Sequence, residues 1–305
     1  MPDIHARGVR FNVLTMGDVG PTLVFVHGVM IDNLSSFYLS LAPALSKSAR
    51  VILYDLRGHG RSEQPPTGYT TDDMADDLDG ILAALDLPDP RVIVVGHSFG
   101  GYIALRFATR HPARVAGLVL LEAHSGMADF GAQMQRTMAL EGEERSELVR
   151  KLFGHWLSKH AARGHAGATP AEAAQVDEAQ VAPDTLDADA RSTVAMVGRL
   201  QRRRRSPLVD TAHRLAETTS FGRDVAAAMP LADAAIAAID CPVLALYGAQ
   251  SDLVPDGDRL ARLLPHCELR MIEGCAHGIL FHATAEVREA MLAWLAATWP
   301  RAPRA

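Results

Sequence analysis

The chain has 305 residues, of which 48% are hydrophobic, and its formal net charge at pH 7 is −6. This composition supplies a sizeable core, and the negative charge argues against a general nucleic-acid binder. No apolar run approaches the ~18 residues of a membrane span, and the first twenty residues lack the apolar stretch of a signal peptide. The three cysteines form no CxxC pair, which argues against a disulfide framework or a zinc site. We therefore expect a cytoplasmic protein without a membrane or nucleic-acid partner.

Short apolar segments recur along the chain and are typical of strands buried on both faces of a parallel sheet. They lie at residues 4–7, 9–15, 22–26, 51–54, 92–95, 115–121, 243–247 and 269–272, the first two being an opening hairpin or edge strands. Helical segments separate them at residues 72–85, 101–110, 256–264 and 284–299. This alternation predicts an α/β fold with a mostly parallel central sheet flanked by helices.

The alternation breaks between residues 124 and 230, where helical signals occur without a convincing strand. Leu148, Leu152 and Trp156, for example, recur every four residues. Because the sheet is unfinished on both sides of this segment, an insertion is expected to cover its open end. We predict that residues 1–123 and 231–305 form the core and that residues 124–230 form a helical cap.

The segment Gly96-His97-Ser98-Phe99-Gly100 lies between an apolar run and a helical run. A buried strand, G-x-S-x-G and a helix in that order form a nucleophile elbow. The sharp turn exposes the Ser98 hydroxyl and aims the Phe99 amide, at the positive end of the helix, at a developing oxyanion. Small flanking residues are needed because bulk there collides with the neighbouring chain. The alternative interpretation is an ordinary Gly-Ser turn.

A nucleophilic serine needs a base, and the base needs an orienting acid. His277 follows one late apolar segment, and Asp252 follows the segment before it. The chain order Ser, Asp, His is that of the α/β-hydrolases. Together with His27-Gly28-Val29 after an early strand and the loop of residues 55–62, it makes the chain resemble the α/β-hydrolase fold family, with an inserted cap.

This resemblance implies roles for further residues. The amide of Val29 is expected to donate to the oxyanion beside that of Phe99. Asp252 lies in the more usual context for the acid, and Glu122, which ends the segment of residues 115–121, is the alternative because some members take the acid from that place. The residues expected to line the substrate pocket are His27, His97, His124, Met127 and Trp156, although His97 and His124 also suit polar packing positions.

The expected activity is that of a serine hydrolase cleaving a carboxylic ester or thioester of a hydrophobic acyl group, since a methionine- and aromatic-rich cap suits apolar groups. Acyl transfer or hydrolysis on carrier-bound acyl groups, lactone or C–C bond hydrolysis, and ligand binding without turnover stay open. The run from Arg202 to Arg205 is either a solvated helix end or a docking patch for an acidic carrier protein. No nucleotide-binding glycine motif or metal-ligand spacing occurs, so we expect no cofactor and no metal.

Overall fold

The computed structural model describes residues 3–29, 32–126 and 207–299. The chain forms two compact units, one of Met1–Gln135 with Thr211–Ala305 and one of Arg136–Asp210. Met127, Trp156 and the run from Arg202 to Arg205 lie outside the described residues, so the predictions for these residues stay predictions.

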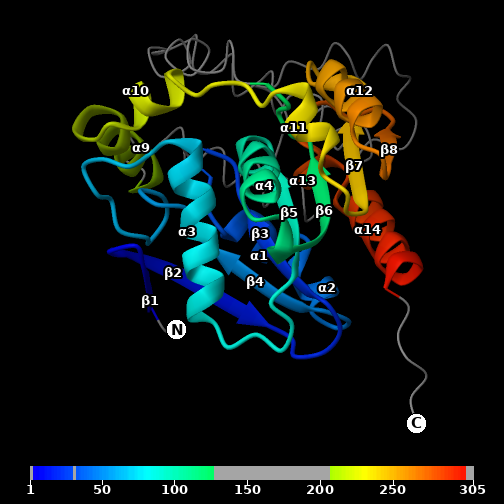
Figure 1. The fold of residues 1–305 in the computed structure, drawn as a ribbon, viewed down its shortest axis with the longest axis horizontal. Helices are drawn as coiled ribbons and strands as arrows, with labels where there is room; N and C mark the ends of the chain where they lie inside the picture. The colour runs from blue at the N-terminus through cyan, green and yellow to red at the C-terminus, as the bar shows by residue number, and fades with distance from the viewer. Residues whose placement is uncertain (1–2, 30–31, 127–206, 300–305) are drawn as a thin grey trace, which may run out of the picture. The chain divides into compact units, whose positions relative to one another are not determined.

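The core of the first unit is an eight-stranded sheet in the order β1-β2-β4-β3-β5-β6-β7-β8 (Figure 1). The strands are β1 (Asp3–Ala6), β2 (Val9–Met16), β3 (Thr22–Val26), β4 (Arg50–Tyr54), β5 (Val92–His97), β6 (Val115–Leu121), β7 (Val243–Gly248) and β8 (Cys267–Ile272). The β1–β2 and β2–β4 pairs are antiparallel, and every pair from β4 to β8 is parallel. The prediction of a mostly parallel α/β sheet is thus confirmed.

Helices cover both faces of this sheet. The longer ones are α3 (Thr71–Ala84), α4 (Phe99–Arg110), α9 (Pro207–Thr218), α12 (Val254–Leu263) and α14 (Thr284–Thr298). The shorter ones are α1 (Ser35–Tyr38), α2 (Ala42–Leu45), α10 (Phe221–Ala226), α11 (Asp233–Ala237), α13 (Ile279–His282) and the 3₁₀ turn Pro112–Arg114. Residues of α3, α4 and α12 pack in the core on one face, and residues of α1, α2, α13 and α14 pack in the core on the other.

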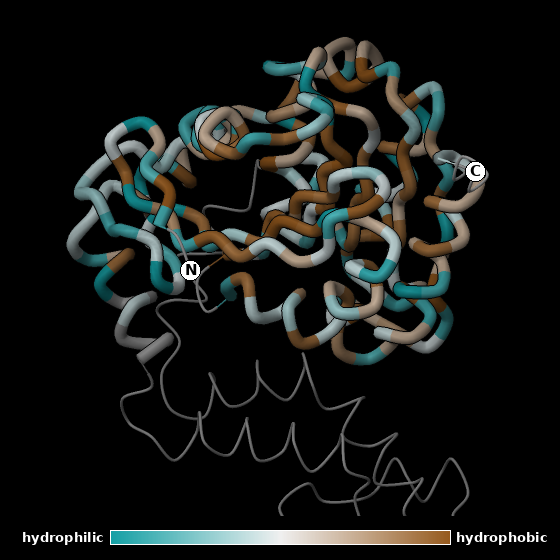
Figure 2. Tube along the Cα trace, turned by 90° about the horizontal axis from the view of Figure 1, so that it is seen from below, coloured by the Kyte–Doolittle hydropathy of each residue, from teal (hydrophilic) through white to brown (hydrophobic). Residues whose placement is uncertain are grey.

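Alternate residues of each inner strand supply these two cores, as the period of two requires. In β3, Val24 and Val26 belong to one core, and Leu23 and Phe25 belong to the other. Figure 2 shows the hydrophobic residues concentrated along the inner strands, with hydrophilic residues on the outer loops. Because β3 and β5 to β8 run in parallel, their carboxyl ends meet at one edge of the sheet, which is where α/β proteins place their sites.

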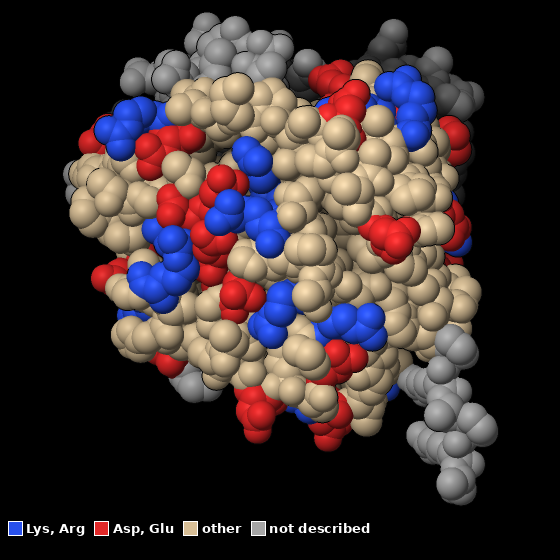
Figure 3. Space-filling view, in the orientation of Figure 1, with Lys and Arg blue, Asp and Glu red and all other residues tan. Residues whose placement is uncertain are grey.

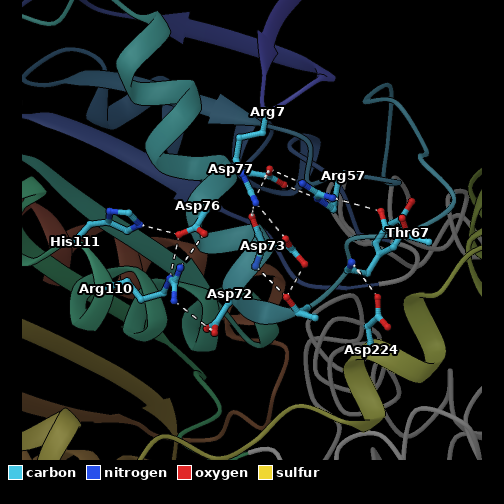
Figure 4. A network of polar contacts seen from close by, with 12 residues as sticks. Arg7, Arg57, Thr67, Asp72, Asp73, Asp76, Asp77, Arg110, His111 and Asp224 are labelled. Carbon is cyan, nitrogen blue, oxygen red and sulfur yellow. Dashed lines mark hydrogen bonds and ion pairs between the residues drawn. The ribbon is translucent and has the colours of Figure 1, made fainter.

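A buried ion pair holds the loop after β4 against α3. The Arg57 guanidinium donates to both carboxylate oxygens of Asp77, and the two side chains are only 5% and 2% exposed. Arg7 joins them through Asp77 and through Asp73, whose carboxylate lies 3.2 Å from the Arg7 guanidinium (Figure 4). Figure 3 shows acidic and basic side chains interleaved on this side of the molecule. The carboxylates of Asp73 and Asp77 on α3 are thus paired with arginines, and these pairs hold the loop and the helix together.

The described end of the predicted cap segment packs on the core. Phe221 of α10 is fully buried, and its ring meets Tyr69 at 5.8 Å and His59 at 5.9 Å, both edge to face. Residues 211–230 therefore belong to the same compact unit as the sheet, whereas the predicted boundary lay at residue 231. The covering role of residues 127–206 remains a prediction.

Candidate active site

The turn between β5 and α4 holds Ser98 in a strained conformation. Ser98 has φ 54° and ψ −120°, a region that side-chain-bearing residues rarely adopt. Its N–H donates to the Leu121 carbonyl of β6 at 2.9 Å, and its carbonyl accepts from the Gly101 N–H at 3.0 Å. These bonds fix the turn between two strands and the first turn of the helix.

Close backbone contacts explain the glycines around Ser98. A Cβ atom at Gly96 would lie 2.5 Å from the Gly100 carbonyl oxygen. One at Gly100 would lie 2.1 Å from the Val26 carbonyl oxygen, and both distances are below any normal contact. The motif is therefore a steric requirement of this turn, as the elbow interpretation assumes.

His277, in the loop between β8 and α13, lies between the serine and a carboxylate. Its Nε2 is 3.0 Å from Ser98 Oγ, and its Nδ1 is 3.2 Å from Glu122 Oε2. Because a carboxylate only accepts hydrogen bonds, Nδ1 carries the proton, and Nε2 accepts from the serine hydroxyl. This is the arrangement that general-base activation of a serine requires.

Glu122 follows β6 and is fully buried, with φ 49°. Its backbone N–H donates to the Leu246 carbonyl at 2.9 Å. Its Oε1 accepts from the Gly248 N–H, and its Oε2 accepts from the Ser251 hydroxyl and from the histidine. Donors from the end of β7 with its following loop, and from the loop after β8, thus hold the carboxylate in one orientation.

The predicted contact between Asp252 and His277 is not the one that forms. Asp252 is exposed, and its neighbour Ser251 is the residue of this loop that turns inward, donating to Glu122 and accepting from the Leu253 N–H at 3.1 Å. The acid beside His277 is Glu122, which the sequence offered as the alternative. The physical reason is the direction of the side chains in the loop after β7: the Ser251 side chain points toward Glu122, and its neighbour Asp252 therefore points to the surface.

The loop after β3 is held by His27. Its Nε2 accepts from the Leu56 N–H at 3.0 Å, so its Nδ1 carries the proton and donates to the Gly28 carbonyl at 2.6 Å. His27 is 1% exposed and has both ring nitrogens engaged by backbone, so the expectation that it lines a pocket needs correction. The Gly28 carbonyl and the Val29 N–H belong to one planar peptide. His27 therefore fixes the direction of the Val29 N–H.

Two further histidines adjoin His277, and their place in a substrate pocket stays a prediction. The His97 ring stacks on it with 5.5 Å between centroids, and the His124 ring lies 6.4 Å away. Burial, with a smaller effect of His277, lowers the pKa of His124 to about 4. His124 is therefore uncharged at neutral pH.

Two residues near the site were not anticipated from the sequence, Ser251 and Asp32. Asp32 accepts from the Gly28 N–H at 2.7 Å and lies 3.8 Å from His97 Nδ1. Neither residue belongs to a motif, and only their contacts across the fold reveal them.

Within residues 3–29, 32–126 and 207–299, no group of three or more His, Cys, Asp or Glu side chains is placed to hold a metal ion. In the same ranges no helix is long and apolar enough to cross a membrane.

Comparison with known proteins agrees with this architecture. A family model described as the alpha/beta hydrolase fold matches residues 21–284. The match covers most of the chain, so the protein belongs to the alpha/beta hydrolase family.

Its sequence relatives have several activities. The chain is 40% identical over 124 residues to a putative non-heme haloperoxidase of Mycobacterium phage D29, a match covering 40% of this chain and 43% of that protein. It is also 40% identical over 122 residues to the 2-hydroxymuconate semialdehyde hydrolase of Pseudomonas sp. strain CF600, covering 39% and 42%. The chain thus matches less than half the length of these relatives.

Solved structures match over nearly the whole length. A serine hydrolase from the polyaromatic hydrocarbon-degrading bacterium Cycloclasticus zankles gives a TM-score of 0.70 at 15% identity, covering 98% of this chain and 99% of that one. A meta-cleavage product hydrolase from Pseudomonas fluorescens IP01 gives 0.67 at 22% identity, covering 97% and 98%. At such identities the similarity establishes the fold alone.

Proposed function

We propose that this protein is a serine hydrolase that cleaves a carboxylic ester or thioester of a hydrophobic acyl group. Ser98 is the nucleophile, His277 the base and Glu122 the acid that orients it. The observation that carries the proposal is the continuous set of contacts from Ser98 Oγ to His277 Nε2, 3.0 Å, and from His277 Nδ1 to Glu122 Oε2, 3.2 Å.

The chemistry follows from this geometry. Ser98 Oγ attacks the acyl carbonyl while its proton passes to His277 Nε2. The buried Glu122 carboxylate stabilises the imidazolium that results, and His277 then protonates the leaving group. A water molecule, deprotonated by His277, releases the acyl group from Ser98 in the second half of the reaction.

Two backbone amides are proposed to hold the oxyanion of the tetrahedral intermediate. One is the N–H of Phe99, at the first residue of α4 and thus at the positive end of the helix. The other is the N–H of Val29, in the peptide that His27 fixes. Loss of one such donor typically costs ~10²–10³ in rate.

A p-nitrophenyl ester series tests this proposal. The protein is expected to release p-nitrophenol, with an initial burst where deacylation is slow, and to prefer medium-length acyl chains over acetate. Ser98→Ala should retain the fold, by circular dichroism, and lose nearly all turnover. Equal turnover in the folded Ser98→Ala variant would contradict the proposal.

Hydrolysis of a carbon–carbon bond beside a ketone is the second candidate. It is favoured by the 40% identity, over 122 residues, to a 2-hydroxymuconate semialdehyde hydrolase. The same serine and histidine serve this reaction, so the substrate distinguishes the two. Turnover of 2-hydroxymuconate semialdehyde with a higher kcat/KM than any ester would favour this candidate.

A further inference from the structure

The carboxylate of Asp32 lies beside residues 27–29, which follow β3 and carry the proposed oxyanion donor, the Val29 N–H; this segment is called the oxyanion loop below. No hydrogen bond among the described residues joins Asp32 to the Ser98 hydroxyl or to His277. Its Oδ2 accepts from the Gly28 N–H at 2.7 Å, and its Oδ1 accepts from the Asn33 N–H at 2.8 Å and from the Ser36 hydroxyl. Burial tends to raise the pKa of Asp32, but its contact with His97 and the nearby His27 and Ser36 hold that pKa well below its usual range. Asp32 is therefore an anion that organises several donors.

The absence of a side chain at Gly28 makes room for this carboxylate. It is not among the glycines with positive φ, so its backbone conformation does not explain the missing side chain. A Cβ atom at Gly28 would lie 2.8 Å from Asp32 Oδ2. The glycine thus allows the carboxylate to approach the amide that precedes the Gly28–Val29 peptide.

The same Oδ2 atom faces the residue before the serine. His97 Nδ1 lies 3.8 Å from it, and the His97 ring stacks on His277 at an interplanar angle of 28°. Among the residues that the structure describes, neither ring nitrogen of His97 has a hydrogen-bond partner, and the Asp32 carboxylate faces Nδ1. The same carboxylate therefore faces both Gly28, just after β3, and His97, at the end of β5.

We propose that Asp32 is a positioning residue that sets the oxyanion loop relative to Ser98 and His277. Gly28 is held at both its polar groups, the N–H by Asp32 and the carbonyl by His27. Because the Gly28 carbonyl and the Val29 N–H share one planar peptide, these two contacts fix the direction in which the Val29 N–H points. The inference rests on the proposed function, because it assigns that N–H to the oxyanion. A misplacement of about 1 Å costs about 10²-fold in rate.

The test compares wild type with Asp32→Ala, Asp32→Asn, Gly28→Ala and the double variant Gly28→Ala/Asp32→Ala. Ser36→Ala is the matched control, because it removes a partner of Asp32 on α1 and leaves the Gly28 contact in place. The readouts are kcat and KM for p-nitrophenyl butyrate and the inhibition constant of an alkyl trifluoromethyl ketone. With that ketone, Ser98 Oγ bonds to the carbonyl carbon, the serine proton passes to His277 and the carbonyl oxygen becomes the oxyanion.

Asp32→Ala is expected to lower kcat about 10- to 100-fold, to change KM less than about threefold and to weaken the ketone by a factor similar to the kcat loss. Asp32→Asn, which keeps one acceptor oxygen, should fall between Asp32→Ala and wild type, and Ser36→Ala should stay within about threefold of wild type. Gly28→Ala should add little in the Asp32→Ala background, since the clash is then absent.

Three results would overturn the inference: an unchanged kcat in Asp32→Ala, a loss confined to KM, or additive effects of Gly28→Ala and Asp32→Ala. Failure of both Asp32 variants to fold would also overturn it, by making the residue a purely structural one. Failure of the proposed function is distinguishable, because the wild-type protein itself would then neither hydrolyse the ester nor bind the ketone.

Discussion

The two residues that follow β5 and β6, Ser98 and Glu122, have similar backbone strain but different means of support. Ser98 has φ 54° and Glu122 has φ 49°. The turn at Ser98 is fixed by backbone packing that admits only glycine at positions 96 and 100. The turn at Glu122 is fixed through its side chain, which accepts from Gly248, Ser251 and His277. Steric exclusion thus supports one side of the site, and hydrogen bonds to a buried charge support the other.

The largest effect is expected from the acid. Glu122→Gln removes the charge and turns an amide donor toward Gly248 or His277, which favours the wrong histidine tautomer. The expected loss of kcat is about 10⁴-fold, by analogy with tautomer errors in other triads. Asp252→Asn is the matched control and should stay within about twofold of wild type, because Asp252 is exposed. Steady-state hydrolysis of one ester by both variants measures this, and the reverse ranking would return the acid to Asp252.

The turn at Ser98 is expected to be disturbed by any added side-chain volume at its glycines, even by a single methyl group. In Gly100→Ala the new methyl would lie 2.1 Å from the Val26 carbonyl oxygen, so α4 and its first amide must shift away from β3. We expect a loss of about 10²-fold in kcat, together with a destabilisation of about 1–3 kcal/mol from overpacking. Urea unfolding and ester kinetics on the same sample measure both. Wild-type values for both would refute the steric account.

A smaller effect is expected from Ser251. Ser251→Ala removes one donor to Glu122 but leaves the Gly248 N–H and the charge in place. A hydrogen bond to a charged group is worth about 1.5–3 kcal/mol, and about 1.4 kcal/mol corresponds to a tenfold change in rate. Because the Gly248 N–H still holds Glu122, we expect the lower end of this range, a loss of about 10-fold in kcat. Ser251→Thr, which keeps the hydroxyl, is the control. A loss equal to that of Glu122→Gln would mean that Ser251 does more than hold the acid.

The smallest effect concerns pH and stability. The folded protein depresses the pKa of His124 to about 4, from an unperturbed 6.5, so the unfolded chain binds the proton more readily. The contribution of His124 to stability is therefore present above pH 6.5 and is lost as the pH falls from 6.5 toward 4. His124→Gln should reduce the loss of stability between pH 7 and pH 5, as measured by urea unfolding at both values. An unchanged pH dependence would contradict this.

The elbow and the sheet were predictable because their causes are local. The segment of residues 115–121 coincides with β6, and the glycines around Ser98 identify the turn from neighbouring residues. The identity of the acid was harder to predict. Asp252 and Glu122 both follow strands, and the choice depends on whether Asp252 or Ser251 turns inward. The contacts of Asp32 with Gly28 and His97 leave no periodic pattern in the sequence, so only the folded chain brings them together.

Covalent labelling identifies the nucleophile directly. The wild-type protein is treated with a fluorophosphonate, and intact-mass and peptide mass spectrometry locate the adduct, with the folded Ser98→Ala and Asp252→Asn variants in parallel. We expect one adduct on Ser98, none in Ser98→Ala and normal labelling of Asp252→Asn. An adduct on another residue, or undiminished labelling of Ser98→Ala, would contradict it.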